Sequence, residues 1–196
     1  MIVIGASGHA KVVIEIAEAM GKPIDMVYDE DVTKISLFQY PITHDSNFEL
    51  GKPSIIAIGN NAIRKRFSKT VDITVSEALI HPTAILSPSA IIGKGSVVMA
   101  GAIVNAHSQI GAHVIINSGA IVEHDCVFLD FAQISPNVSL AGGVTVGEET
   151  HIGIGTSVIQ GVSIGNKVMV GAGAVVLRDI EDHDKVAGVP AKTIKK

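Results

Sequence analysis

An aliphatic or phenylalanine side chain recurs at every sixth position across the second half of the chain. The residue two places earlier is small or slender each time, as with Ala102 before Val104. A period of six fits neither one face of an α-helix nor a long strand, but it fits short flat strands separated by tight corners. The large side chains would then point into a solenoid, because alternate residues of a strand share one face. The repeat positions are Leu86, Ile92, Val98, Val104, Ile110, Ile116, Val122, Phe128, Ile134, Leu140, Val146, Ile152, Val158, Ile164, Val170 and Val176.

The first 80 residues lack this period and predict a small α/β domain. An apolar strand over 1–4 is followed by a glycine-containing turn and an amphipathic helix over 11–20. Two further strands are predicted over 25–31 and 53–58, and a second helix opens at 59–61. This order is typical of about half of a Rossmann unit, whose ligands lie beyond the carboxyl ends of the strands.

We therefore predict two domains, a small α/β unit over residues 1–80 and the solenoid over residues 81–196. His81-Pro82 marks the predicted entry into the solenoid. The period fails after Val176, where a turn over 188–192 and a basic tail follow.

Composition excludes several classes of protein. A hydrophobic content of 47% supports a folded core. The net charge of −4, without a basic cluster, argues against a nucleic-acid partner. No apolar run reaches the ~18 residues of a membrane span, and no secretory leader is recognisable, so we expect a cytoplasmic protein without membrane insertion. The single cysteine, Cys126, lies at a slender repeat position and is expected to pack inward.

Glu123-His124-Asp125 is the most reactive-looking triplet of the solenoid. With three hexads in each coil, residue i lies beside residue i+18, so Gly142 is expected about 5 Å from His124. Acyl transfer needs a base for the attacking group and an N–H donor for the developing oxyanion, and this pair offers both. Asp125 could orient the imidazole, although the same spacing places it beside His107, a competing partner.

The N-terminal domain holds weaker candidates. The turn over residues 5–9 falls short of the GxGxxG spacing, but a turn at a helix N-terminus still offers free N–H groups to a phosphate. Asp29 and Glu30 follow the second predicted strand, where they could accept hydrogen bonds from a base or a sugar. Arg64 and its two basic neighbours either face a diphosphate or form the solvated side of a helix.

These motifs, with Gly59-Asn60-Asn61, Ala141-Gly142 and Gly188-Val189-Pro190-Ala191-Lys192, resemble the nucleotide-sugar N-acetyltransferases of the PglD type over nearly the whole chain. Relatives of that family include the sialic acid O-acetyltransferases. The resemblance implies an α/β half-Rossmann domain followed by a left-handed parallel β-helix. The spacing alone does not give the hand of the helix, and general crossover rules favour the opposite one.

The resemblance also implies roles for individual residues. His124 would be the general base, Asp125 would orient it and the Gly142 N–H would meet the thioester oxygen. Asp125 stands where the family often has glutamate, and Gln133 stands where some members have a second histidine. The implied nucleotide-sugar contacts are Ser7, His9, Asp29, Glu30, Asn60, Arg64 and Asn117, and the implied acetyl-CoA contacts are Gly142, Gly155, Gly173 and Pro190.

We predict an acetyl-CoA-dependent N-acetyltransferase for a nucleotide-linked amino sugar, a UDP-4-amino-4,6-dideoxyhexose, in glycan biosynthesis. It would use no metal. It would form a homotrimer, because closed rotational symmetry needs only one type of contact between subunits. Uridine rests on the resemblance alone, and the sequence leaves open the nucleotide base, the sugar configuration, the pathway and whether nitrogen or oxygen is acetylated.

Three other functions compete with this prediction. A sialic acid O-acetyltransferase would need the same base. A zinc hydratase of the carbonic anhydrase type would need three convergent histidines, and the spacing of His107, His113 and His124 does not obviously provide them. A non-catalytic assembly module would bind neither CoA nor a nucleotide.

Overall fold

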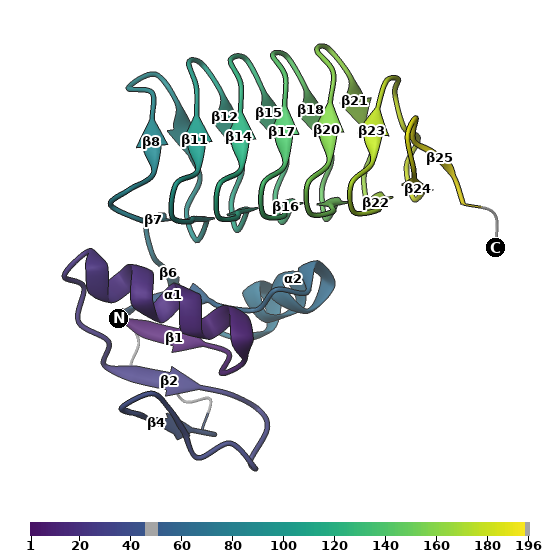
Figure 1. The fold of residues 1–196 in the computed structure, drawn as a ribbon. Coiled ribbons are helices and arrows are strands. Elements are labelled where there is room, and N and C mark those ends of the chain that lie inside the picture. Colours follow the sequence, from purple (N-terminus) through teal and green to yellow (C-terminus); the bar gives the residue numbers. More distant parts are fainter. Residues whose placement is uncertain (46–50, 195–196) are drawn as a thin grey trace.

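The computed structural model describes residues 1–45 and 51–194. A small α/β unit lies against one side of a long parallel β-solenoid, at the end where the solenoid begins (Figure 1). Helix α2 extends from this unit along the solenoid, so the two parts share a joint (Figure 1).

The N-terminal sheet has six strands in the order β3-β4-β2-β1-β5-β6. All pairs are parallel except β3 with β4. Helix α1 covers one face, where Val13 packs with Val3, and α2 places Phe67 against Ile4 on the other. The three predicted strands and both predicted helices are present. The elements are β1 Ile2–Ile4, α1 Gly8–Ala19, β2 Met26–Tyr28, β3 Ser36–Leu37, β4 Tyr40–Thr43, β5 Pro53–Ile56, α2 Asn61–Thr70 and β6 Thr74–Val75.

The solenoid has three walls of short parallel strands. The first wall contains β7 Leu79–Ile80, β10 Val97–Val98, β13 Ile115–Ile116, β16 Gln133–Ile134, β19 His151–Ile152, β22 Met169–Val170, β24 Lys185–Ala187 and the antiparallel β25 Lys192–Thr193. The second contains β8 Ile85–Leu86, β11 Ile103–Val104, β14 Ile121–Val122, β17 Ser139–Leu140, β20 Ser157–Val158 and β23 Val175–Val176. The third contains β9 Ile91–Ile92, β12 Gln109–Ile110, β15 Val127–Phe128, β18 Thr145–Val146 and β21 Ser163–Ile164.

The predicted register of eighteen residues is confirmed by the strand pairs. Ile103 pairs with Ile121, for example, and Val104 with Val122. The repeat aliphatics point inward as predicted, and Val104 and Val122 are fully buried. Cys126 is also fully buried in this core, and burial raises the pKa of its thiol, which suits packing better than reaction.

The two ends of the solenoid differ from the simple repeat. Strand β7 already pairs with β10, so the register begins at Leu79, just before the predicted entry. At the other end the period does fail after Val176, but the first wall continues, because β24 pairs with β22 at a separation of sixteen residues. Asp179 Oδ1 accepts the Ser163 N–H there at 2.8 Å and tightens the corner. The basic tail, residues 195–196, lies outside the described residues.

Candidate active site

His124 lies at a corner between the second and third walls, two residues after the end of β14. Main-chain bonds to both neighbouring coils fix this corner. The Glu123 N–H donates to Leu140 O at 3.0 Å, and the Asp125 N–H donates to Ala106 O at 2.9 Å. The His124 side chain is 61% exposed, so the imidazole lies on the rim of the solenoid and can meet a ligand.

The carboxylate of Asp125 determines which imidazole nitrogen is free. Its Oδ2 lies 2.8 Å from His124 Nδ1. A carboxylate can only accept, so Nδ1 carries the hydrogen and Nε2 keeps its lone pair for a proton. Asp125 has a positive φ of 59°, a conformation that aspartate adopts more readily than most residues. Asp125 thus pairs with the imidazole beside it in sequence, and the competing His107 is not its hydrogen-bond partner.

Gly142 lies under the imidazole of His124. A Cβ on Gly142 would stand 2.5 Å from His124 Cε1 and 2.6 Å from Nε2, so any larger residue would displace the ring. Within residues 1–45 and 51–194, the Gly142 N–H donates to no acceptor, whereas the next amide, Gly143 N–H, donates to His124 O at 2.9 Å. A base and a free amide donor therefore share one rim, which is the arrangement that acyl transfer requires.

The other residues expected to contact acetyl-CoA lie elsewhere. Gly155 and Gly173 form the corner between the first and second walls, each with a φ of 66° and open space around the Cβ position. Asn117 lies at this same corner, and its Oδ1 accepts the Ser118 N–H at 2.8 Å. Pro190 follows β24 near the end of the solenoid. Within one chain, the predicted solenoid residues therefore lie at two different edges of the second wall. Asn117, Gly155 and Gly173 lie at the edge opposite to His124 and Gly142.

A cavity of about 220 Å³ opens beyond the carboxyl ends of β1, β2 and β5, where the sequence predicts a ligand. Ser7, Asp29 and Glu30, three of the predicted contacts, line it. Ser7 is the N-cap residue of α1, and its side chain makes no capping bond. Arg66 also lines the cavity and lies 3.1 Å from Glu30. This concave, partly apolar site suits the base and ribose of a nucleotide.

Asp29 holds the wall of this cavity together. Its carboxylate accepts the Ala6 N–H at 2.7 Å, the Asp31 N–H at 2.9 Å and Lys34 Nζ at 2.9 Å. Burial raises the pKa of Asp29, but these hydrogen bonds and the Lys34 charge outweigh it, and the net pKa is lowered. The residue therefore stays ionised and joins the loop between β1 and α1 to the loop after β2.

Arg64 does not face the cavity. Its side chain is 1% exposed, and its guanidinium joins α2 to the solenoid. Burial lowers the pKa of Arg64 to about 10, against the opposing charge of Glu149, so the group remains charged at neutral pH. Of the three basic residues at 64–66, the structure places Arg66 where a nucleotide could reach it. The partners of Arg64 are the carbonyl oxygens of His113, Phe131, Ile58 and Gly59 and Oδ1 of Asn61, at 2.9–3.2 Å.

His9 lies at the same joint and not in the cavity. Its Nε2 is buried without a hydrogen-bond partner in the described part of the chain. His113 stacks on Phe131 with ring centroids 5.0 Å apart, and its Nδ1 is likewise buried and unpaired there. Burial, and after it the charge of Arg64, lowers the pKa of His9, His113 and His151. The joint is therefore built from neutral histidines around one buried cation.

Acidification is expected to destabilise this joint. The pKa of His9 is lowered from 6.5 to about 4, so between these values the unfolded chain binds a proton that the folded chain does not. The contribution of neutral His9 to the free energy of unfolding is fully present above pH 6.5. It falls by up to about 3 kcal/mol as the pH is lowered towards 4. Urea unfolding at pH 7 and pH 5 should show a smaller loss in His9→Asn than in the wild type. His183→Asn, at an exposed residue, is the control, and equal losses in wild type and H9N would contradict the expectation.

A second cleft, of about 560 Å³, lies between the start of α2 and the first wall. Asn60 Oδ1 caps α2 by accepting the Ile63 N–H at 3.0 Å, and Asn61 Nδ2 donates to Glu149 O at 2.9 Å. The sequence analysis missed most of this cleft. The signal is the column of outward residues eighteen apart on the first wall, which begins at Gln133. The residues of this cleft include Asn60, Asn61, Gln133, His151, Lys167 and Met169.

Within the described ranges, no three histidine, cysteine, aspartate or glutamate residues converge in a way that could hold a metal ion. A search of the same ranges finds no helix with the length and apolar character that crossing a membrane requires.

Comparison with known proteins gives consistent matches. Residues 1–71 match the family model of the PglD N-terminal domain. The chain is 38% identical to a variant of perosamine N-acetyltransferase from Caulobacter crescentus, solved with CoA and GDP-perosamine, with a TM-score of 0.93 over 100% of this chain and 96% of that one. It is 40% identical to the acetyltransferase domain of PglB from Neisseria gonorrhoeae, solved with acetyl coenzyme A, with a TM-score of 0.91 and 98% of each chain covered.

A more distant match supports the fold only. WeeI from Acinetobacter baumannii is 20% identical, with a TM-score of 0.64 over 98% of each chain. Together with the matches above, it confirms the predicted fold class, an α/β unit followed by a left-handed parallel β-helix.

Proposed function

Because this chain belongs to the hexapeptide-repeat acyltransferases that include the PglD-type nucleotide-sugar N-acetyltransferases, we propose that it acetylates the amino group of a nucleotide-linked amino sugar. It is an acetyltransferase, and its relatives were crystallised with CoA or acetyl-CoA. The observation that carries the proposal is the position of His124 over the free amide of Gly142, paired with Asp125.

The proposed reaction is a direct attack in a ternary complex. His124 Nε2 takes a proton from the sugar amine as its nitrogen bonds to the acetyl carbonyl carbon. The Gly142 N–H donates to the oxygen of the tetrahedral intermediate, and Asp125 stabilises the imidazolium. When the intermediate collapses, the carbon–sulfur bond breaks, and the imidazolium returns its proton to the leaving thiolate. The amide product and CoA thiol balance the amine and thioester consumed.

The two cavities support binding of the acceptor in two parts. The 220 Å³ cavity at Ser7 and Arg66 is smaller than the roughly 300–1,000 Å³ typical of ligand pockets, so it would hold only part of a nucleotide sugar. The 560 Å³ cleft at Asn60 borders the same segment, residues 58–63. We place the nucleoside in the first cavity and the sugar towards the second, with Asn60 and the start of α2 between them.

A homotrimer would complete the site. His124 and Gly142 lie at one edge of the second wall, and Asn117 and Gly155 lie at its other edge. If the second walls of three copies face a common axis, the first edge of each copy meets the second edge of its neighbour, which unites the predicted set. Ile85 on this wall is 63% exposed, as an interface residue would be in a single chain. Light scattering should therefore give three times the 20.4 kDa of one chain, and a monomer would contradict the trimer.

A panel of acceptors tests the function. We propose 4-amino-4,6-dideoxyhexose as the sugar and uridine as the base, with guanosine as the rival, because a 38% identical relative was solved with GDP-perosamine. Purified protein with acetyl-CoA is offered the UDP-, GDP- and dTDP-linked amino sugars and sialic acid, and thiol release and acceptor mass are followed. The UDP sugar is expected to have the highest kcat/KM. A higher kcat/KM with the GDP sugar would show that guanosine, not uridine, is the base. Acetylation of sialic acid alone would show that the acceptor is sialic acid, and no transfer to any acceptor would refute the proposed function.

A further inference from the structure

The edge of the solenoid that holds the two proposed catalytic groups is supported from inside by two polar side chains. Ser108 Oγ donates to Glu123 O at 2.7 Å, and Cys126 Sγ donates to Ala141 O at 3.4 Å. Both side chains are fully buried in the core. Each acceptor belongs to the residue directly before one of the two proposed catalytic groups.

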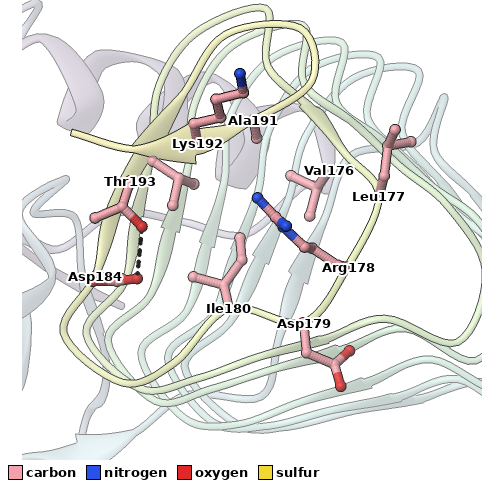
Figure 2. A pocket seen from close by; sticks show the side chains of 10 residues that line it. Val176, Leu177, Arg178, Asp179, Ile180, Asp184, Ala191, Lys192 and Thr193 are labelled. Atoms are coloured by element: carbon pink, nitrogen blue, oxygen red, sulfur yellow. Dashed lines mark hydrogen bonds between the residues drawn. The ribbon is translucent and has the colours of Figure 1, made fainter.

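These two side chains differ from the others at the slender repeat positions along this edge. The remaining three are hydrocarbon side chains without a donor: Ala90, Val144 and Val162. Donor and acceptor are fifteen residues apart in both bonds, so the polar side chains serve the corners of His124 and Gly142. Leu177 and Arg178 lie at the last corner of the edge (Figure 2), and the slender position fifteen residues before Leu177 offers no donor.

The two carbonyl oxygens lack the main-chain donor that other corners use. At Asn117, for example, the carbonyl oxygen accepts the N–H three residues further on at 3.1 Å. Among the residues that the structure describes, no backbone N–H donates to Glu123 O or Ala141 O. Because a buried carbonyl needs a partner, the side chains of Ser108 and Cys126 replace the turn hydrogen bond at these two corners.

The direction of the Ala141 carbonyl determines where the Gly142 amide points. In a trans peptide the C=O and N–H bonds point in opposite directions. Because Cys126 holds the carbonyl oxygen towards the core, the N–H is directed to the rim. Burial raises the pKa of the Cys126 thiol, so the sulfur keeps its hydrogen at neutral pH and can donate it. A hydrogen bond to the carbonyl also polarises the peptide and strengthens its N–H as a donor.

Ser108 fixes the main chain on both sides of the proposed base. Its hydroxyl donates to Glu123 O and accepts the Cys126 N–H at 3.3 Å. These two residues directly precede and follow the pair His124 and Asp125. One buried hydroxyl therefore sets the backbone from which the imidazole and its carboxylate partner project.

We propose that Ser108 and Cys126 are positioning residues for acetyl transfer, which fix His124 and Gly142 from inside the solenoid. This inference rests on the proposed function, which makes those two groups the base and the oxyanion donor. Neither side chain touches a substrate, because both are fully buried. They affect the rate of the chemical step through geometry and leave the binding of both substrates unchanged.

Removing each donor tests the proposal. Cys126→Ala and Ser108→Ala should each lower kcat about threefold to tenfold, the contribution of one hydrogen bond, with KM for acetyl-CoA and for the nucleotide sugar unchanged. Cys126→Ser and Ser108→Cys each keep a donor and should recover most of the loss, since a hydroxyl and a thiol both occur at these positions. An unchanged kcat in both alanine variants, or no recovery in the exchanged ones, would overturn the proposal.

Ser96 provides a matched control at a corner without a proposed catalytic group. Its hydroxyl donates to Gly111 O at 2.8 Å and accepts the Val114 N–H at 2.9 Å, the same pair of bonds that Ser108 makes. Ser96→Ala should therefore lose about as much stability in urea as Ser108→Ala but keep the wild-type kcat. An equal fall of kcat in S96A would show that the loss follows from a weakened solenoid and would overturn the proposal.

The wild type distinguishes this inference from the function on which it rests. If the wild type transfers no acetyl group to any amino sugar, the proposed function is refuted. If it does, and the alanine variants have the same kcat, only the positioning role is refuted. Should Ser108→Ala not fold, Cys126→Ala decides the outcome, because Ala90 shows that this edge accepts alanine at a slender position. Calorimetry with free CoA should give the wild-type Kd in C126A, and weaker binding would contradict the role.

Discussion

Replacing His124 with alanine is expected to lower kcat by about two to four orders of magnitude, the usual contribution of a general base. The imidazole is exposed on the rim and contributes nothing to the core, so the free energy of unfolding should stay within about 0.5 kcal/mol of the wild type. The main-chain bonds of this corner do not involve the side chain. The measurements are single-turnover and steady-state rates with acetyl-CoA and the preferred acceptor, alongside urea unfolding.

Variants around His124 separate its chemical role from its position. His107→Ala removes an exposed imidazole one coil away, beside Asp125 in the register, and should retain the wild-type kcat. Gly142→Ala should lower kcat with little loss of stability, because the new Cβ pushes an exposed ring aside and leaves the backbone in place. Asp125→Asn should also lower kcat, since an amide can offer a donor to Nδ1 and favour the wrong tautomer. A normal kcat in H124A, or an equal loss in H107A, would contradict the assignment.

Replacing Arg64 with alanine is expected to lower the free energy of unfolding by about 3–5 kcal/mol, the cost of breaking a buried charged network. The guanidinium donates to five acceptors, two of them carbonyl oxygens of the solenoid, and these would lose their donors. Arg64→Lys should recover little, because an ammonium lacks the planar fork that reaches several carbonyls. Urea unfolding followed by circular dichroism measures the loss.

Arg66 provides a matched control on the same helix. Its guanidinium pairs with Glu30 at 3.1 Å, and both side chains are more than half exposed, so Arg66→Ala should change stability by less than about 1 kcal/mol. R66A should instead raise KM for the nucleotide sugar, since Arg66 lines the cavity. If R64A unfolded like the wild type and raised only KM for the nucleotide sugar, the structural role of Arg64 would be refuted. The result would instead support the direct contact with the ligand that the sequence suggests.

Much of the solenoid could be predicted because its determinants are local. Val104 and Val122 recur at a fixed spacing, and a chain that must bury each of them while keeping short strands has few ways to do so. The same spacing placed Gly142 beside His124. The spacing did not predict strand β7 before the first repeat position. It also did not predict that the last coil is two residues shorter, because that coil depends on the Asp179 side chain replacing a main-chain acceptor for the Ser163 N–H.

The N-terminal candidates depended on contacts far apart in sequence. Arg64 and Arg66 are two residues apart on one helix and look alike in the sequence, yet one lies in the joint with the solenoid and the other lines the cavity. Their difference comes from which face of α2 meets His113 and Phe131. No local pattern in residues 59–70 carries that information.

The sequence by itself determined the coil length, the inward aliphatics, the order of the two folds and the meeting of His124 with Gly142, because a strict period converts position along the chain into position in space. Only the tertiary structure decided that Arg64 is buried in the joint and that Asn60 borders a cleft. These outcomes depend on how the α/β unit packs against the solenoid, and such packing is set by contacts between residues far apart in the chain.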